Sequence, residues 1–405
     1  MNTRPNIESP NTTQVLSISF NNDSSCFAVG LNTGISGRSP PLARSGGLVE
    51  LTWPAVFQSK TCLLKSTRDF GAGVGLVQMM GTTNYLALVG GGRFPKFASN
   101  KVIIWNDLAG KVAMEISTLA AVRGVQLSRS RIAIILQNSV RLYSFEKPPN
   151  LISVYETADN VMGLCSLSDK VIAFPGRTPG QVQLVDVSTG NVSIIPAHSS
   201  ALKAIQLSPD GGLLATASDT GTIIRVHATS NCARVAELRR GIDPATIFSL
   251  AFSPSGTLLA CTSDKATLHI FDIPHPKKTS KKHATALPSS STILPSAGDG
   301  DGRGKWGILG KIPLMPRVFS DVYSFASAGF EAGDETVIGG LQLSGNTTLG
   351  TARPAKGIIG WVGEDSLVVV GAGHDARWEK FVIAVGEDGR RHCVREGWKR
   401  YLSNN

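Results

Sequence analysis

Two stretches of the chain, LSPDGGLLATASDTGTIIRVH (207–227) and FSPSGTLLACTSDKATLHIFD (252–272), are nearly superimposable. Each begins with a Ser-Pro turn, continues as a short apolar strand, turns again at Ser-Asp and runs back as a second strand. The matched pairs, each 45 residues apart, are Ser208 and Ser253, Pro209 and Pro254, Ser218 and Ser263, Asp219 and Asp264, and Thr222 and Thr267. A repeat of this length and pattern is typical of one blade of a β-propeller.

Weaker copies of the same strand–turn–strand pattern occur along the rest of the chain. They span residues 17–34, 84–107, 125–145, 164–187 and 357–383. With the two strong repeats they make seven units, and seven blades close a ring without a long free sheet edge. The sequence therefore predicts an all-β protein, a seven-bladed WD-repeat-like β-propeller formed by residues 1–405 as a single domain.

Two segments depart from the repeat. Residues 35–62 contain prolines and little alternation where blade one needs a strand. We predict an irregular insertion there, or a poorly ordered product of a wrongly assembled coding sequence. Residues 274–305 are rich in Lys, Ser, Pro and Gly and cannot bury enough apolar area to fold alone. They are predicted to be a long disordered basic loop within blade six.

The overall composition narrows the classes of function. The formal net charge of +10 attracts nucleic acid, acidic lipid or acidic protein. Residues 1–14 lack the apolar stretch of a signal peptide, and no run reaches the roughly 18 apolar residues of a spanning helix. Membrane contact is therefore expected to be peripheral. The six cysteines show neither CxxC nor zinc-like spacing and are predicted to be reduced, with no metal or cofactor.

Between the strong repeats stands Leu238-Arg239-Arg240-Gly241. Guanidinium groups bind phosphate oxygens through paired, charge-assisted hydrogen bonds. Neighbouring strand residues point to opposite sides, so the two arginines are predicted to serve different pockets. With the repeats and GAGHDARWEKF (371–381), the chain resembles the PROPPINs, also called WIPI proteins, which are phosphoinositide-binding propellers. The leucine of the motif resembles the LRRG subgroup, the WIPI-three/four-like and fungal swollen-vacuole-type members.

The resemblance implies two phosphoinositide pockets built from the repeated segments. The first would use His198, Thr216, Ser218, Thr222 and Arg225 with Arg239. The second would use Ser263, Thr267 and His269 with Arg240. Hydroxyls donate hydrogen bonds to phosphate oxygens, and histidine adds positive charge as the pH falls. One departure lies beside the second pocket, where Ala266 stands in place of the family's usual glycine.

The resemblance also implies membrane and partner contacts. Family members carry a membrane-inserting loop in blade six, and the predicted membrane-contacting residues are Lys277, Lys278, Lys281 and Lys282. The segment that follows, with Trp306, is either an interfacial anchor or an ordinary core strand. The partner contacts implied for blades one and two are Asn21, Asp23, Arg93 and Lys96. For Asn21 and Asp23 the alternative is a structural Asx turn.

These features together predict a non-enzymatic, monomeric adaptor in autophagy and in vacuolar or endosomal traffic. It would bind phosphatidylinositol 3-phosphate and phosphatidylinositol 3,5-bisphosphate and recruit partners, including an autophagy lipid-transfer protein. The expected location is the cytoplasm, peripheral on preautophagosomal, vacuolar or endosomal membranes. The alternative is a generic WD-repeat scaffold without lipid specificity. No nucleic-acid contact is predicted, because aromatic residues do not interleave with the basic ones along a groove.

Overall fold

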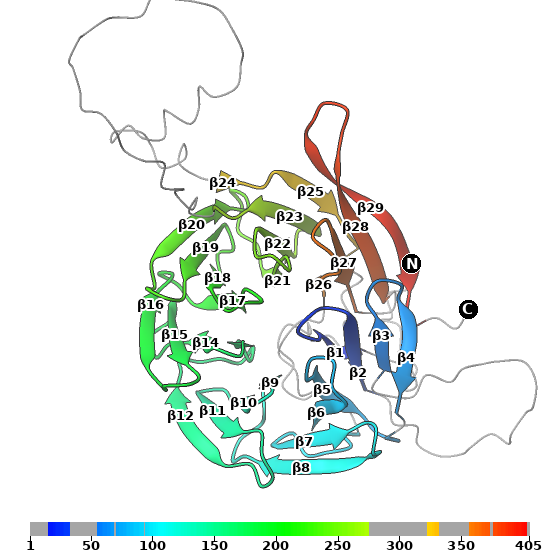
Figure 1. Ribbon diagram of the computed structural model, residues 1–405, viewed down its shortest axis with the longest axis vertical. Helices are drawn as coiled ribbons and strands as arrows, with labels where there is room; N and C mark the ends of the chain where they lie inside the picture. Colours follow the sequence, from blue (N-terminus) through cyan, green and yellow to red (C-terminus); the bar gives the residue numbers. More distant parts are fainter. Residues whose placement is uncertain are drawn as a thin grey trace, which may run out of the picture.

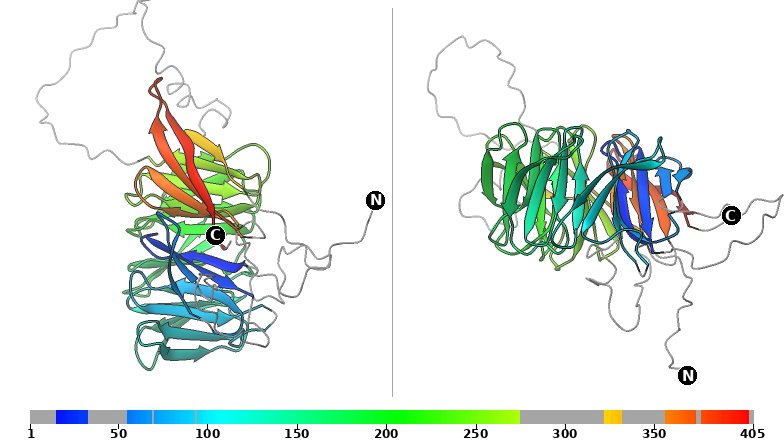
Figure 2. Two further views of the ribbon diagram at one scale, coloured as in Figure 1. Left: turned by 90° about the vertical axis from the view of Figure 1, so that its right-hand side faces the viewer. Right: turned by 90° about the horizontal axis from the view of Figure 1, so that it is seen from below.

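The computed structural model describes residues 15–32, 55–68, 70–92, 94–274, 322–331, 356–372 and 376–402. These residues form seven sheets arranged around a central axis, and the strands within them are antiparallel except for one short parallel pair in blade five (Figure 1). Seen from the side, the ring is a flat disc whose strands run through its thickness (Figure 2). No described residue lies in a helix, so none belongs to a membrane-spanning helix. The architecture is the predicted seven-bladed β-propeller.

The blades follow one another in chain order, and each strand borders the next within its sheet except where noted below. Blade one contains β1 (Val15–Phe20), β2 (Cys26–Leu31), β3 (Ala55–Gln58) and β4 (Leu63–Thr67); blade two contains β5 (Val74–Met79), β6 (Tyr85–Gly90), β7 (Lys101–Asn106) and β8 (Lys111–Ser117). Blade three contains β9 (Gly124–Leu127), β10 (Arg131–Ile135), β11 (Ser139–Ser144) and β12 (Leu151–Glu156); blade four contains β13 (Ser166–Leu167), β14 (Val171–Pro175), β15 (Gln181–Asp186) and β16 (Val192–Pro196). Blade five contains β17 (Leu202–Leu207), β18 (Leu213–Ser218), β19 (Ile223–Ala228) and β20 (Arg234–Arg239); blade six contains β21 (Ile247–Phe252), β22 (Leu258–Ser263), β23 (Thr267–Asp272) and β25 (Ala326–Gly329). Blade seven contains β26 (Ile358–Trp361), β27 (Ser366–Val370), β28 (Arg377–Val385) and β29 (Arg391–Arg400).

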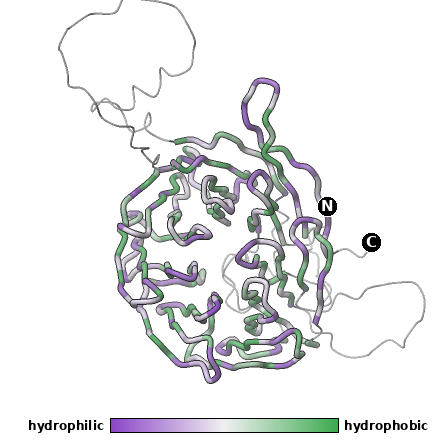
Figure 3. The backbone as a smooth tube through the Cα atoms, in the orientation of Figure 1, coloured by the Kyte–Doolittle hydropathy of each residue, from purple (hydrophilic) through white to green (hydrophobic). Residues whose placement is uncertain are grey.

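The second strand of each blade is the apolar centre of its sheet. All six residues of β22 are buried, because both faces of the sheet pack against neighbouring blades. The preceding turn is fixed by one polar side chain: Ser208 Oγ accepts a hydrogen bond from the amide of Leu213 at 2.8 Å, and Ser253 Oγ accepts one from Leu258 at 3.1 Å. Hydrophilic residues gather at hairpin ends such as the projecting β28–β29 tip (Figure 3).

Blades one and seven close the ring through side chains, since each blade keeps its four strands in its own sheet. The indole Nε1 of Trp378 donates a hydrogen bond to the carbonyl of Ser59 at 2.8 Å. The Tyr401 ring lies edge-on to Phe27 and Phe57, with centroids 5.7 and 5.5 Å away. A buried aromatic cluster therefore joins the two ends of the described chain.

Blade one differs from its prediction. The predicted irregular segment extended to residue 62, but residues 55–58 form β3, with Ala55 and Phe57 buried against the core. Residues 59–62 make the turn into β4, where Cys62 has a φ of 55°. The prediction was wrong for residues 55–58, because a four-residue strand beside a proline carries almost no periodicity. Residues 33–54 lie outside the described residues.

Blade six is interrupted after β23. The predicted basic loop 274–305 lies outside the described residues apart from Pro274, as do its four lysines and Trp306. The description resumes at β24 (Val322–Tyr323), which joins the sheet of blade five by pairing in parallel with Leu238 and Arg239 of β20. The chain then crosses to blade six, where β25 pairs with β23. Residues 322–329 therefore bridge blades five and six at the rim (Figure 1).

Candidate functional site

The Leu-Arg-Arg-Gly motif lies at the end of the outer strand of blade five. Leu238 is fully buried, and Arg239 is the last residue of β20, paired with Ile223. Arg240 follows immediately, and its amide donates a hydrogen bond to the carbonyl of Thr222 at 2.9 Å. The motif is thus held by backbone pairing on one side and by core packing of its leucine on the other.

One group of predicted residues meets on the face of blade five that looks toward blade four. Nε2 of His198 lies 3.0 Å from Oγ1 of Thr216. Arg225 is opposite Thr216 in the sheet and donates from Nη1 to the carbonyl of Ala197 at 2.6 Å. Because side chains alternate along a strand, Arg239 lies on the same face of β20 as the residue opposite Arg225.

Glu237 is the residue opposite Arg225 in this sheet, and it was not among the predicted site residues. Its Oε2 accepts hydrogen bonds from Arg225 Nε at 3.0 Å and from Arg234 Nη1 at 2.8 Å. The side chains of Arg225 and Glu237 are only 22% and 18% exposed. His198, Thr216, Arg225 and Glu237 form the blade-five cluster. Alternation along β20 would have indicated Glu237, two residues before Arg239.

The two other hydroxyl residues predicted for the first pocket lie nearby but make different contacts. The hydroxyl of Ser218 is 3.0 Å from that of Thr220, and Ser218 is buried. Thr222 is half-buried and lies in the turn before β19, where its carbonyl accepts the amide of Arg240. Ser218 and Thr222 therefore shape the turn beneath the motif rather than bonding to His198 or Arg225.

The two repeats are not structural copies around this turn. Gly221 and Ala266 donate matching amide hydrogen bonds to Ser218 and Ser263, both at 3.1 Å. Beyond the turn the registers differ: Thr216 pairs with Arg225, whereas Cys261, 45 residues after Thr216, pairs with His269. The turn of blade six is one residue shorter, so His269 takes the position of Arg225. The pairing of Thr222 with Thr267 by spacing was therefore wrong in structural terms.

The second arginine lies in the seam between blades five and six. Arg240 is 8% exposed; its Nε donates to the carbonyl of Gly221 at 2.8 Å, and its Nη2 donates to the carbonyl of Asp243. Its charge reaches blade six, because it lowers the pKa of His269 in addition to the larger effect of burial. A guanidinium has five N–H groups, so three remain to meet an anion.

His269 is bonded on both sides of its ring. Nε2 lies 3.2 Å from Oγ1 of Thr267, and Nδ1 lies 3.1 Å from Oγ of Ser324. Arg240, Thr267, His269 and Ser324 form the blade-six cluster. Ser324 was missed because it lies 55 residues from His269, between β24 and β25, and no local sequence signal relates the two.

The predicted residue Ser263 is fully buried, and its hydroxyl has no hydrogen-bond partner. An unpaired buried hydroxyl costs roughly 1–3 kcal/mol. Ser263 follows Cys261 by two residues on β22, so it lies on the face that also carries His269.

The imidazoles of both clusters are neutral near pH 7. Burial, followed by the charge of Arg225, lowers the pKa of His198 to about 4. Burial and then Arg240 lower the pKa of His269 as well. These rings are therefore hydrogen-bonding groups rather than cations at neutral pH, and a nearby anion would favour their protonation.

Ala266 has an unusual backbone conformation. Its φ is 52°, in the left-handed region that favours glycine, and the matching Gly221 has a φ of 60°. An alanine in this region is strained by about 1–2 kcal/mol. Ala266 N donates to Ser263 and its carbonyl accepts the amide of Phe330, so the turn keeps its shape despite the substitution.

The implied partner contacts divide into buried and exposed residues. Asn21 is buried; its Oδ1 accepts the amide of Cys26 at 3.0 Å, and its Nδ2 donates to the carbonyl of Gly81 at 3.2 Å. Ser208 and Ser253 make the first of these contacts in their own turns, because each side-chain oxygen accepts the amide five residues further along the chain. Asp23 and Lys96 are exposed, and Arg93 lies outside the described residues.

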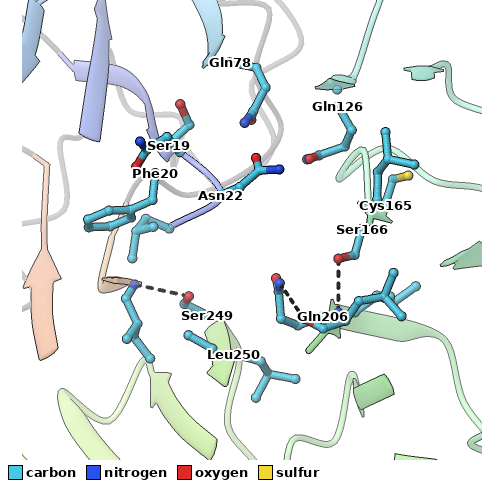
Figure 4. A pocket seen from close by; sticks show the side chains of 18 of the residues that line it. Ser19, Phe20, Asn22, Gln78, Gln126, Cys165, Ser166, Gln206, Ser249 and Leu250 are labelled. Carbon is cyan, nitrogen blue, oxygen red and sulfur yellow. Dashed lines mark hydrogen bonds between the residues drawn. The ribbon is translucent and has the colours of Figure 1, made fainter. Parts of the chain in front are cut away.

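A central channel with a volume of about 560 Å³ runs along the propeller axis. The side chains of Gln78, Gln126 and Gln206 extend into it from three blades, beside Ser19 and Ser249 (Figure 4). Such an amide-lined channel is where a generic WD-repeat scaffold would hold a peptide. Among the described residues, no three His, Cys, Asp or Glu side chains gather as metal ligands would.

Comparison with known proteins places this architecture in a family. A family model described as PROPPIN matches residues 102–288. The chain is 48% identical to SVP1-like protein 2 of Neurospora crassa over 99% of both chains, and 56% identical to that of Emericella nidulans over 80% of this chain and 99% of the relative.

Solved structures show the same fold at low sequence identity. The crystal structure of Hsv2 from Kluyvelomyces marxianus superimposes with a TM-score of 0.69 at 20% identity, covering 97% of this chain and 100% of that one. A complex of KlAtg21 with the coiled coil of AgAtg16 superimposes with a TM-score of 0.61 at 19% identity, covering 96% of this chain and 99% of that one. By its sequence relatives and its fold, the chain belongs to the PROPPIN family of phosphoinositide-binding β-propellers.

Proposed function

We propose that this protein is a non-catalytic adaptor that binds phosphatidylinositol 3-phosphate and phosphatidylinositol 3,5-bisphosphate in two pockets. It acts in autophagy and in vacuolar or endosomal traffic, on preautophagosomal, vacuolar or endosomal membranes. One relationship supports the proposal. Arg239 ends β20 on the strand face that carries Glu237 and the blade-five cluster, whereas Arg240 follows it in the seam with blade six, near His269. The LRRG subgroup remains a prediction.

Each residue has a simple role in this proposal. Arg239 and Arg240 bind phosphate oxygens through paired hydrogen bonds. Thr267 and the buried Ser263 supply hydroxyl donors. Thr216 donates to the carbonyl of Arg225 at 3.3 Å, and Nε2 of His198 donates to the carbonyl of Thr216 at 3.2 Å, so these two residues shape the wall of the first pocket. Binding alone localises the protein, so no group needs to act as a nucleophile or as a general base.

The same membrane face would be reinforced by Lys277, Lys278, Lys281 and Lys282. Two headgroup sites and a basic segment on one surface multiply weak contacts through effective concentration. A protein partner is supported by the KlAtg21–AgAtg16 complex among the similar structures. For this chain we propose an autophagy lipid-transfer partner, with Asp23 and Lys96 as exposed candidates for the contact.

The proposal is tested by co-sedimentation with vesicles that contain or lack phosphatidylinositol 3-phosphate. Arg239→Thr and Arg240→Thr are compared singly and together with the wild type. The matched control is Arg129→Thr plus Lys111→Thr, which removes the same charge from exposed positions on blades three and two. We expect lipid-dependent pelleting of the wild type and the control, weaker pelleting of each single variant, and none of the double variant.

Equal pelleting of the wild type and the double variant on any acidic vesicle would mean that the arginines are incidental. The protein would then be a basic scaffold, and the central channel would be the site to examine next. Repeating the co-sedimentation with vesicles that contain phosphatidylinositol 3,5-bisphosphate compares the binding of the two lipids.

A further inference from the structure

Large apolar side chains are exposed on both sides of the arginine motif. Ile242, two residues after Arg240, is 83% exposed. Tyr323 and Val322 of β24 are 51% and 37% exposed. These three side chains form the apolar rim. Isolated apolar residues on a protein surface are common, but these lie together on the rim of blade five.

The backbone fixes their distance from the arginines. Tyr323 pairs directly with Arg239 in the parallel β20–β24 ladder, so their Cα atoms lie about one strand spacing, roughly 4.8 Å, apart. Ile242 is three residues beyond Arg239 and lies at most about 11 Å from it along the chain. Apolar and cationic side chains therefore share one small area, as they do in proteins that contact bilayer surfaces.

The supports of this rim are ordered. The loop that carries Ile242 is tied down where Arg240 donates to the carbonyl of Asp243 and where Ala245 donates to that of Thr220 at 3.1 Å. Beyond β24, Ser324 bonds to His269, and the Phe325 ring lies under the guanidinium of Arg391 at 3.6 Å. The exposed side chains are thus presented by backbone that is held in place by hydrogen bonds and side-chain contacts.

We propose that Ile242 and Tyr323 enter the boundary between headgroups and acyl chains of an anionic bilayer when the arginines hold their lipids. The inference rests on the proposed function and adds a contact to it. Charge complementarity favours a bilayer as the occupant, because Arg239 and Arg240 adjoin the apolar rim and attract the anionic surface of the bilayer. Tyrosine suits this depth, since its ring is apolar and its hydroxyl stays among the headgroups.

The direct test introduces a tryptophan at the rim. Ile242→Trp is mixed with vesicles of phosphatidylcholine and phosphatidylinositol 3-phosphate, with or without brominated acyl chains, and the wild-type emission is subtracted. Leu119→Trp is the matched control, since Leu119 is 94% exposed on blade two. We expect a blue shift and bromine quenching for Ile242→Trp and neither for Leu119→Trp.

Binding supplies a second measurement. Ile242→Ser and Tyr323→Ser should each weaken vesicle binding about three- to tenfold, whereas Leu119→Ser should leave it unchanged. If the tryptophan emission of Ile242→Trp is not quenched on vesicles that the protein binds, the insertion of the apolar rim is refuted and the proposed function still stands. Failure of the wild type to bind such vesicles would instead refute the proposed function. A change in sedimentation coefficient of Ile242→Ser without vesicles would show that the rim joins two copies, and would also overturn the proposal.

Discussion

The carboxylate of Glu237 accepts a hydrogen bond of 3.0 Å from Nε of Arg225, on the face of blade five that also carries Arg239. A negative charge therefore lies inside the cluster proposed to bind an anionic headgroup. The carboxylate of Glu237 positions Arg225 and at the same time neutralises part of the positive charge of Arg225. The residue at the matching position of blade six is Ser327, opposite His269, so the two proposed pockets differ in charge.

Glu237→Gln should bind phosphoinositide vesicles more tightly than the wild type, by about two- to fivefold. The amide keeps an acceptor for Arg225 but removes the repulsion of a phosphate, an effect of about 0.5–1 kcal/mol for a partly exposed pair. Titration of vesicles against labelled protein measures it. Glu237→Ala serves as the contrast, because it also releases Arg225. Weaker binding by the Gln variant would show that the charge itself is required.

Ala266→Gly should stabilise the fold by about 0.5–1 kcal/mol, because glycine adopts the φ of 52° without strain but loses more entropy on folding. In thermal unfolding this corresponds to roughly 1–3 °C. The reciprocal change, Gly221→Ala, should be strongly destabilising, since its Cβ would lie 1.8 Å from the carbonyl oxygen of Ala245. An unchanged or lower melting temperature for Ala266→Gly would show that the alanine is not strained.

His227→Phe should reduce the loss of stability in acid. Burial, followed by Arg225 and Arg234, lowers the pKa of His227 from 6.5 to about 4. Between these pH values the unfolded chain binds more protons than the folded one. The contribution of neutral His227 to the free energy of unfolding is therefore fully present above pH 6.5 and is lost as the pH falls toward 4. The slope is at most about 1.4 kcal/mol per pH unit.

Melting temperatures at pH 7.5 and pH 5 measure the effect of His227→Phe. Phenylalanine is a reasonable replacement, because Phe271 of blade six pairs with Leu259 as His227 pairs with Leu214. Leu119→Phe, at an exposed position without a titratable group, is the control and should keep the wild-type difference between the two pH values. An equal acid shift in all three proteins would exclude His227 as a contributor.

Tyr401 should be the most sensitive point of ring closure. Tyr401→Phe removes the hydroxyl that donates to the carbonyl of Gly371 at 2.7 Å and should cost about 1 kcal/mol. Tyr401→Ala also empties the space beside Phe27 and Phe57 and should cost about 3–5 kcal/mol. Thermal unfolding monitored by tryptophan fluorescence separates the two. Similar melting of both variants would mean that the ring contacts contribute little.

Asn21→Ala should lower the melting temperature, because it leaves the buried amide of Cys26 unpaired at a cost of about 1–3 kcal/mol. Asn21→Ser should recover part of the loss, since serines make this contact in blades five and six. Asp23→Asn, on the exposed side of the turn, should change stability by less than about 0.5 kcal/mol. If Asn21→Ala melts like the wild type, its side chain serves a partner rather than the turn.

The repeat made the propeller predictable, because a 45-residue period of turns and apolar strands has few other solutions. It could not reveal β3, whose four residues are too few for a pattern. It also misaligned Thr222 with Thr267, since equal spacing in the sequence concealed a turn that is one residue shorter in blade six.

The site was predictable only where its residues are local. Alternation along β20 puts Glu237 on the same face as Arg239, so its place in the candidate site was accessible from the sequence. Ser324 was not, because it reaches His269 only after the chain has left blade six and returned beside blade five. Contacts that depend on where a long segment rejoins the ring have no signature in either of the two stretches involved.

The return of the chain at β24 has a mechanical consequence. The segment between β23 and β24 leaves from blade six and arrives on blade five, so its two ends are anchored on opposite sides of the seam that holds Arg240. A pull on that segment by a membrane would load both blades at once. On blade five the load would pass along the β20–β24 ladder into Leu238 and Arg239, so tension and lipid capture would both act on Arg239.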